Sequence, residues 1–292
     1  MRFGRTALLS ALLACGGCAT APLERGGSLA SYDRLADANG LVTRSQIRAN
    51  KKDLLAAKTV RIAATSFAAR RDIAFNDHER RLVANAISRE LCLRLGERFR
   101  IVSAGEDADL TIQATVTHAT PTNAAASGAS KVASIATSVA LPGVPVPVPR
   151  LPIGLGTLSV EAEARDFAGF QKAAMVWARG ASAIGSSPRL ASAGDAYDLA
   201  AEFGADFARL VSTGESPFVG LPALPSLGSL PARLGAAPKY VACEAFGRFP
   251  GVAGLAGQGL GLPPDWTDSG AKDGPLATPG PRPSDAEQPL TH

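Results

Sequence analysis

Strict alternation of apolar and polar residues predicts two strands in the middle of the chain. Residues 110–118 alternate leucine, isoleucine, alanine and valine with threonine and glutamine, and residues 158–166 alternate leucine, valine and alanine with serine, glutamate and arginine. A period of two is typical of a strand that buries one face. Residues 172–183 predict a third strand, so that the three form an antiparallel meander with a polar outer face. Shorter apolar stretches at 59–65 and 99–103 predict two further strands.

Two other segments place their apolar residues on one face of a helix. Asn76 and Glu79 form a capping-box pattern at the start of the first, which runs to Leu95 and stops at Gly96. The second covers residues 193–211, with a stripe of leucine and phenylalanine. Packing both stripes on one sheet would bury them. The predicted fold is an α+β two-layer sandwich: a mostly antiparallel sheet with two helices on one face, followed by a disordered Pro/Gly-rich C-terminal tail.

The first eighteen residues resemble the export signal of a bacterial lipoprotein. Arg2 and Arg5 precede an apolar run at residues 6–14, which is too short to span a bilayer as a helix. The small residues and cysteines that follow resemble a lipobox, in which a cysteine is alkylated by a diacylglyceryl group and becomes the new N-terminus. We favour Cys18, which follows two glycines, over the alternative Cys15, because a signal that ends before Cys15 would be unusually short.

The residue after the lipobox cysteine bears on localisation. An aspartate there tends to retain lipoproteins in the inner membrane of Gram-negative bacteria, and this chain has Ala19 instead. By analogy with that sorting rule, we expect a lipid-anchored protein of the outer membrane that faces the periplasm.

A disulfide between Cys92 and Cys243 is allowed in that oxidising compartment. The leucines around Cys92 favour a buried free thiol instead.

These signals divide the chain into successive parts. Pro22, Gly26 and Gly27 discourage regular structure after the signal and indicate a tether. Proline and glycine crowd into the last third and indicate a largely disordered tail, with one short ordered piece near residues 240–249. The predicted parts are a lipoprotein signal peptide (1–17), a lipidated tether and N-terminal segment (18–57), an α+β domain (58–212) with an apolar Pro-rich insert (130–156), and the tail (213–292).

The insert is the most unusual stretch of the predicted domain. Residues 132–149 carry no charge, and the prolines from Pro142 to Pro152 exclude a helix in the second half. We rank packing on the protein's own sheet first, contact with a membrane or a partner second, and a pore element third. The residues predicted for such a contact are Val132, Ile135, Val139, Leu141, Val144, Val146 and Val148.

The sequence carries no recognisable catalytic or metal-binding motif. The three histidines lie at a predicted helix start, at a strand end and in the tail: His78, His118 and His292. None has the spacing of a metal site or a catalytic motif. Glu161 and Glu163 share one strand face, where we expect them to face water and to pair with Arg165 rather than to act as acid and base. We therefore predict no enzyme activity, no cofactor and no metal.

The charge pattern does not favour nucleic-acid binding. The formal net charge is +4, the lysines and arginines are scattered, and no basic stripe carries interleaved aromatic residues. The densest basic cluster comprises Arg44, Arg48, Lys51 and Lys52. A solvated surface accounts for this cluster as well as contact with anionic lipid or an acidic partner does.

Three segments resemble a bacterial lipoprotein family known as domain of unknown function 3313: residues 29–35 (LASYDRL), 108–114 (ADLTIQA) and 156–166 (GTLSVEAEARD). The resemblance covers roughly residues 18–212. The chain departs from the family pattern at residues 168–171, where the family has a Thr-Gly-Glu turn, and its Pro-rich tail is extra. The resemblance implies a periplasm-facing lipoprotein domain, and it implies no activity, cofactor or active-site residue.

Together these features predict a membrane-anchored lipoprotein of the bacterial cell envelope that serves as a non-enzymatic interaction or structural module. Its expected partners are membrane lipid, through the N-terminal acyl chains, and an envelope protein. The alternative is an envelope hydrolase or a transport accessory protein without a recognisable active-site motif.

Overall fold

Eight strands form one mixed sheet in the order β1-β2-β8-β7-β6-β3-β5, with β4 beside β6. The computed structural model describes residues 20–69, 73–123, 125–126, 154–182, 189–220 and 227–268. The strands are β1 (Ala36–Asp37), β2 (Thr43–Ala49), β3 (Thr59–Ile62), β4 (Ser66–Phe67), β5 (Arg100–Val102), β6 (Leu110–Thr120), β7 (Thr157–Arg165) and β8 (Gln171–Gly180).

The predicted meander is present as β6, β7 and β8, and it forms the centre of the sheet. β6 pairs antiparallel with β7, and β7 pairs antiparallel with β8. β2 extends the antiparallel part on the far side of β8. On the other side, β3 pairs in parallel with both β5 and β6. The sheet is therefore mixed, with a mostly antiparallel centre.

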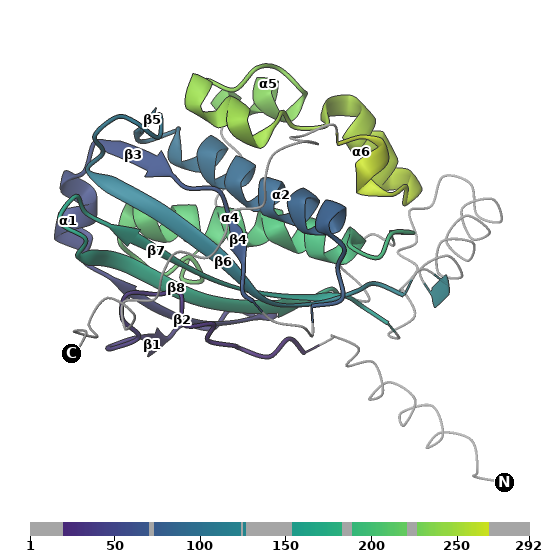
Figure 1. Ribbon diagram of the computed structural model, residues 1–292, viewed down its shortest axis with the longest axis horizontal. Helices are drawn as coiled ribbons and strands as arrows, with labels where there is room; N and C mark the ends of the chain where they lie inside the picture. The colour runs from purple at the N-terminus through teal and green to yellow at the C-terminus, as the bar shows by residue number, and fades with distance from the viewer. Residues whose placement is uncertain are drawn as a thin grey trace, which may run out of the picture.

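Two long helices cover one face of this sheet, as the sequence predicts (Figure 1). They are α2 (Asp77–Leu95) and α4 (Gly194–Thr213), and the short α1 (Lys51–Ala56) follows β2. The capping box of α2 is formed: the Glu79 amide donates to Asn76 Oδ1 at 2.9 Å, and the Asn76 amide donates to Glu79 Oε2 at 3.0 Å. These reciprocal bonds fix the start of the helix. The α+β prediction with two helices on one face is confirmed.

The aromatic residues gather where α4 meets the sheet. Trp177 of β8 is fully buried, and its ring centroid lies 5.7 Å from that of Phe203, which lies 6.1 Å from that of Phe207. The Trp177 indole N–H donates to Asp206 Oδ2 at 2.9 Å, so that the one polar atom of this side chain is satisfied inside the core. Burial raises the pKa of Asp206, although the indole donor and two arginines act in the opposite direction.

We expect Asp206→Asn to change the pH dependence of stability. A carboxyl whose pKa is higher in the folded state than in the unfolded state costs stability once it ionises. Asparagine keeps an oxygen that can accept from Trp177 but carries no charge. The variant should therefore gain stability relative to the parent as the pH rises from acidic to neutral. Urea unfolding at both pH values checks this, with the exposed Asp107→Asn as control for the loss of one carboxylate. A constant difference between variant and parent would contradict the expectation.

The segment predicted as a tether is part of the fold. Residues 21–32, which we call the strap, lie along the face of the sheet opposite the helices (Figure 1). Leu29 is buried against Ala174 and Val176 of β8. The sheet also begins earlier than the predicted domain start at residue 58, because β2 pairs along its whole length with β8. The outer face of the meander is covered here rather than left to water.

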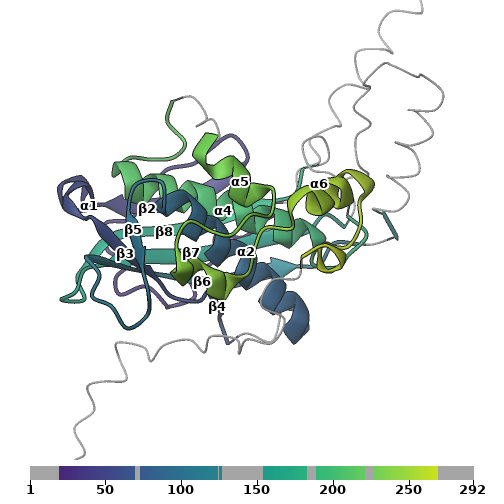
Figure 2. The same ribbon diagram turned by 90° about the horizontal axis from the view of Figure 1, so that it is seen from above.

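The chain after α4 is also better ordered than the sequence predicts. Residues 227–268, which we call the C-terminal segment, form short helices over α2, where the sequence indicates a disordered tail (Figure 2). They are η1 (Leu227–Ser229), α5 (Leu230–Arg233), η2 (Val241–Phe246), α6 (Gly251–Leu260) and η3 (Pro264–Trp266). The predicted ordered piece near residues 240–249 contains η2. Residues 269–292 of the tail lie outside the described residues.

A disulfide ties the C-terminal segment to α2. Cys92 and Cys243 are bonded, and their Cα atoms lie 5.9 Å apart. The expectation of a buried free thiol at Cys92 is wrong, although the residue is buried as expected. The apolar neighbours of Cys92 cannot reveal a partner 151 residues away along the chain.

Among the described helices, none is both long and apolar enough to cross a membrane.

Candidate functional site

The residues predicted for lipidation and for the insert contact lie outside the described residues. This holds for Cys15 and Cys18, and for Val132, Ile135, Val139, Leu141, Val144, Val146 and Val148. Their roles stay predictions. The described residues that flank residues 127–153 meet at one end of the sheet, where the Asn123 amide donates to the carbonyl oxygen of Gly154 at 2.8 Å. The insert therefore leaves the sheet between the end of β6 and the start of β7.

A buried carboxylate holds the strap on the sheet. Glu161 of β7 is fully buried and accepts three hydrogen bonds from the strap. The amide of Ser28 donates to Oε1 at 2.7 Å, while the amide of Gly26 and the hydroxyl of Tyr32 donate to Oε2 at 3.0 and 2.6 Å. Burial and the bond to Glu161 raise the pKa of Tyr32 above its ordinary value, so its hydroxyl remains a donor.

The next carboxylate on the same strand face continues this pattern. Glu163 accepts from the amide of Ala30 at 2.8 Å and from the side-chain amide of Gln171 at 2.7 Å. It also pairs with Arg165, as predicted. The prediction that Glu161 and Glu163 face water is wrong, because the strap covers both. A carboxylate that is saturated with fixed donors is suited to holding structure, and it is poorly placed to exchange protons with a substrate.

The two glycines of the strap serve a defined backbone geometry rather than flexibility. A Cβ atom on Gly26 would lie 2.6 Å from Cγ2 of Thr117, closer than atoms can approach. Gly27 has a φ of 78°, a backbone conformation that side chains other than hydrogen disfavour. Both features let the backbone turn its amides toward Glu161. The sequence signal was present, but a Gly-Gly pair after a proline is also typical of a linker.

The histidines do not form a catalytic arrangement in the described part of the chain. His78 is exposed at the start of α2. His118 of β6 lies with Nδ1 3.5 Å from Oε1 of Glu24 in the strap. His292 lies outside the described residues. No group of three or more histidine, cysteine, aspartate or glutamate residues within the described ranges is placed to hold a metal ion.

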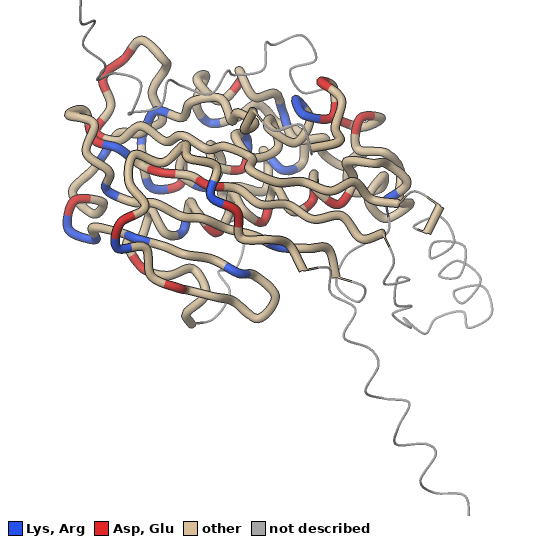
Figure 3. Tube along the Cα trace, turned by 60° about the horizontal axis from the view of Figure 1, so that its bottom comes forward, with Lys and Arg blue, Asp and Glu red and all other residues tan. Residues whose placement is uncertain are grey.

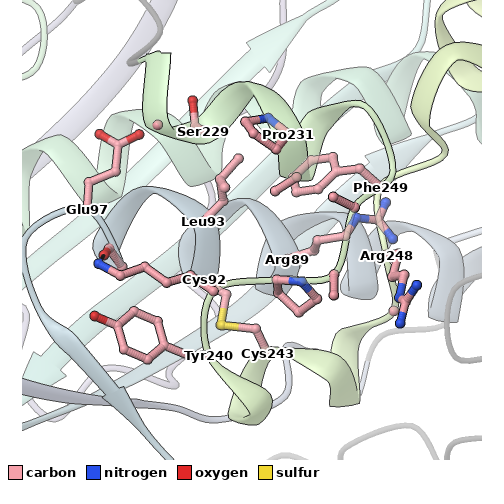
Figure 4. Close-up of a pocket in the computed structure, with 18 residues that line it drawn as sticks. Arg89, Cys92, Leu93, Glu97, Ser229, Pro231, Tyr240, Cys243, Arg248 and Phe249 are labelled. Carbon is pink, nitrogen blue, oxygen red and sulfur yellow. Dashed lines mark hydrogen bonds between the residues drawn. A yellow bond between two sulfur atoms is a disulfide. The ribbon is translucent and has the colours of Figure 1, made fainter.

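A cavity of about 580 Å³ lies between α2 and the C-terminal segment. Leu93 of α2, Phe249 of the C-terminal segment and the Cys92–Cys243 disulfide are among the groups that line it (Figure 4). Its charged lining residues are Arg89, Glu97, Lys239 and Arg248. Such a mostly apolar hollow with a few charges is suited to a small amphipathic molecule. Its described lining contains no histidine that could serve as a base.

Arg89, which lines this cavity, also belongs to a buried ion pair. Arg89 of α2 donates to both oxygens of Asp268 at 3.2 and 2.6 Å, and the Tyr197 hydroxyl donates to Asp268 Oδ2 at 2.6 Å. Burial raises the pKa of Tyr197, and the Asp268 carboxylate adds to this. This network joins α2 and α4 to the end of the C-terminal segment. No local sequence pattern indicates it, because its three members come from distant parts of the chain.

Charges are interspersed over the described chain (Figure 3). Many are paired: Lys51 with Glu215 at 2.5 Å, Arg179 with Glu202 at 2.8 Å and Lys172 with Asp53 at 2.8 Å.

Comparison with known proteins gives one family and a set of distant structures, of which three are described. Two structures of a PelC dodecamer from Paraburkholderia phytofirmans are 10% identical to this chain with TM-scores of 0.36; they cover 59% and 60% of it, and 99% and 98% of their own chain. A DUF4136 family protein from Bacteroides thetaiotaomicron is 11% identical with a TM-score of 0.31, over 59% of this chain and 97% of its own. No curated protein matches the sequence.

The family comparison agrees with the resemblance seen in the sequence. The model described as "Protein of unknown function (DUF3313)" matches residues 24–207. This range begins in the strap and ends within α4, and so it covers the whole sheet, α2 and most of α4. The chain belongs to the DUF3313 family of proteins of unknown function.

Proposed function

We propose that this protein is a lipoprotein of the bacterial cell envelope, acylated at Cys18 or alternatively at Cys15. The proposed location is the outer membrane, with the domain facing the periplasm. The export signal and the lipobox-like sequence Gly16-Gly17-Cys18 support this proposal. The disulfide between Cys92 and Cys243 agrees with an oxidising compartment.

One structural observation carries the proposal furthest: the chain just after Cys18 is built into the domain. Ala21 is buried, and the carbonyl oxygen of Pro22 accepts from Ser159 Oγ at 2.5 Å. Glu161 then holds Gly26 and Ser28. A lipid on Cys18 would therefore be connected through a short link to a buried, hydrogen-bonded strap. Any pull on that lipid is transmitted to the centre of the sheet.

We propose a non-enzymatic role as an interaction or structural module. The carboxylates on β7 are occupied by the strap, and His118 faces Glu24 of the strap with Nδ1 3.5 Å from Oε1. The cavity beside α2 favours a second candidate, a transport accessory protein that carries a small amphipathic molecule. A hydrolase has weaker support, because the described cavity lining contains no histidine that could act as the base.

Metabolic labelling with an alkyne fatty acid tests the anchor. We expect the native chain and Cys15→Ser to take up the label and to pellet with membranes, whereas Cys18→Ser should be unlabelled, because serine has no thiol to alkylate. Loss of label in Cys15→Ser alone would move the site to Cys15. A native chain without any acyl group, released freely from membranes, would refute the proposal.

A further inference from the structure

The strap brings the proposed acylation site close to the sheet. Pro22 is held by Ser159 of β7 at 2.5 Å, and Glu24 is held through its carbonyl oxygen by Thr117 Oγ1 at 3.2 Å. Cys18 precedes Pro22 by four residues, and four residues of extended chain span at most about 14 Å. A bilayer that holds acyl chains on Cys18 must therefore come within roughly that distance of Pro22. The domain cannot stand far off on a long tether.

The register of the strands shows which end of the sheet this is. Ser159 lies opposite Ala178 of β8, and Ala178 lies opposite Arg44 of β2. Directly opposed residues point to the same face of a sheet. Two strand spacings separate β7 from β2, which places exposed Arg44 on the strap's face about 10 Å from Ser159. At this end β6 and β8 stop and β2 and β7 start.

The turn between β1 and β2 presents an apolar side chain at this same end. Leu41 is 105% exposed and Val42 is 45% exposed, three and two residues before Arg44. The turn has a defined backbone, since the Gly40 amide donates to the carbonyl oxygen of Thr43 at 2.9 Å. A fully exposed leucine next to a cation is the composition of a contact with the membrane interface.

The opposite end of the sheet offers a comparison. The turn between β7 and β8 presents Phe167, which is 90% exposed, together with Phe170, which is 68% exposed. This turn adjoins the start of β8, which pairs with the end of β2, so it lies a strand's length away from Leu41. The two apolar turns therefore distinguish a domain that stands on the first end, which keeps Phe167 away from the membrane, from a domain that lies flat on its strap face, which brings both turns to it.

We propose that the end of the sheet with the β1–β2 turn rests on the bilayer, with Leu41 inserted at the membrane interface and Arg44 beside anionic headgroups. This orientation rests on the proposed acylation at Cys18. The short link selects the end, the exposed leucine supplies the apolar contact, and the arginine supplies charge complementarity to anionic lipid. Phe167 then points away from the membrane into the periplasm.

Fluorescence at two engineered positions tests the orientation. Leu41→Cys and Phe167→Cys are each labelled with the environment-sensitive fluorophore NBD, since Cys92 and Cys243 are consumed by the disulfide. The full acylated chain is reconstituted in vesicles of phosphatidylethanolamine and phosphatidylglycerol. We expect a blue shift and a several-fold rise in emission at position 41, with quenching by nitroxide-labelled lipid, and no change at position 167. Thermal unfolding of both labelled proteins confirms that each is folded.

The outcomes separate this inference from the proposal on which it rests. Mass spectrometry and vesicle flotation of the same samples report whether the chain is acylated and bound. An acylated, floating protein with position 41 in water, or with position 167 quenched, overturns the orientation and leaves the anchor intact. If NBD emission at position 41 rises with protein concentration in the absence of vesicles, a second copy of the chain covers Leu41. That result also overturns the proposed orientation. A chain without acyl groups overturns both.

Discussion

Glu161→Ala should lower the free energy of unfolding by about 3 kcal/mol or more, because it leaves three donors of the strap without an acceptor. Those donors are the amides of Gly26 and Ser28 and the hydroxyl of Tyr32. Each donor that loses a charged partner in a buried place forfeits a strong hydrogen bond. We expect the strap to detach before the rest of the sheet unfolds. Urea unfolding measures the total loss, and amide hydrogen exchange at Gly26 and Ser28 measures the local one.

Tyr32→Phe is the matched control for this prediction. It removes one of the three donors, together with the acceptor of the Gly27 amide, and keeps the ring against β8, so we expect a smaller loss of about 1–2 kcal/mol. Glu161→Gln keeps the size of the side chain but removes its charge and one acceptor, because the amide nitrogen cannot accept a hydrogen bond, so its loss should lie between those of the other two variants. If Glu161→Ala unfolds at the same urea concentration as the parent and its strap amides stay protected, the carboxylate is not what holds the strap.

Replacing both Cys92 and Cys243 by alanine should lower the free energy of unfolding by about 3–5 kcal/mol, because the bond closes a very long loop of chain. The two cysteines are separated by 151 residues, and this loop contains β5 to β8 and α4. Without the bond, the C-terminal segment is held on α2 by weaker contacts and by the buried pair between Arg89 and Asp268. We therefore expect proteolysis within residues 227–268 to become much faster.

A reductant provides the control for the disulfide. Unfolding of the parent protein should shift to lower urea in the presence of a reductant, whereas the double variant should be unaffected by it. The strap should stay protected in both, since it lies on the opposite face of the sheet. Equal stability of variant and parent, with no effect of reductant, would show that the bond contributes nothing to the fold.

Local patterns predicted the helices and strands that are determined by interactions between residues close together in the sequence. The alternation along β6 and β7 and the capping box at Asn76 report burial and hydrogen bonding within one element. Of the meander strands, only β7 and β8 are joined by a short turn, at residues 166–170, whereas residues 121–156 separate β6 from β7. The meander could still be assembled from its parts, because strands that follow one another in sequence usually lie side by side. The lipobox-like sequence is likewise a local pattern, and it gives the proposed anchor without any fold.

The strap shows where local pattern was insufficient. Gly26 and Gly27 have the composition of a linker, and Glu161 has the composition of a solvated strand face. Each interpretation was reasonable alone, and both fail because the two segments lie on each other, 135 residues apart. A weak signal was present in Leu23, Leu29 and Leu35, which recur every six residues and pack on β8. The contact between the strap amides and the carboxylates of β7 depends on both segments, and neither segment alone predicts it.

By itself, the sequence determined the α+β class, the positions of the long strands and helices, and the signal that suggests export and acylation. Only the tertiary structure decided that the strap covers the second face, that Cys92 finds Cys243, and that Leu41 lies at the same end of the sheet as the chain leading to Cys18. The physical reason is the distance along the chain over which each kind of interaction acts. Periodicity and capping act over a few residues, whereas hydrogen bonds, disulfides and surfaces join residues that the folded chain alone brings together.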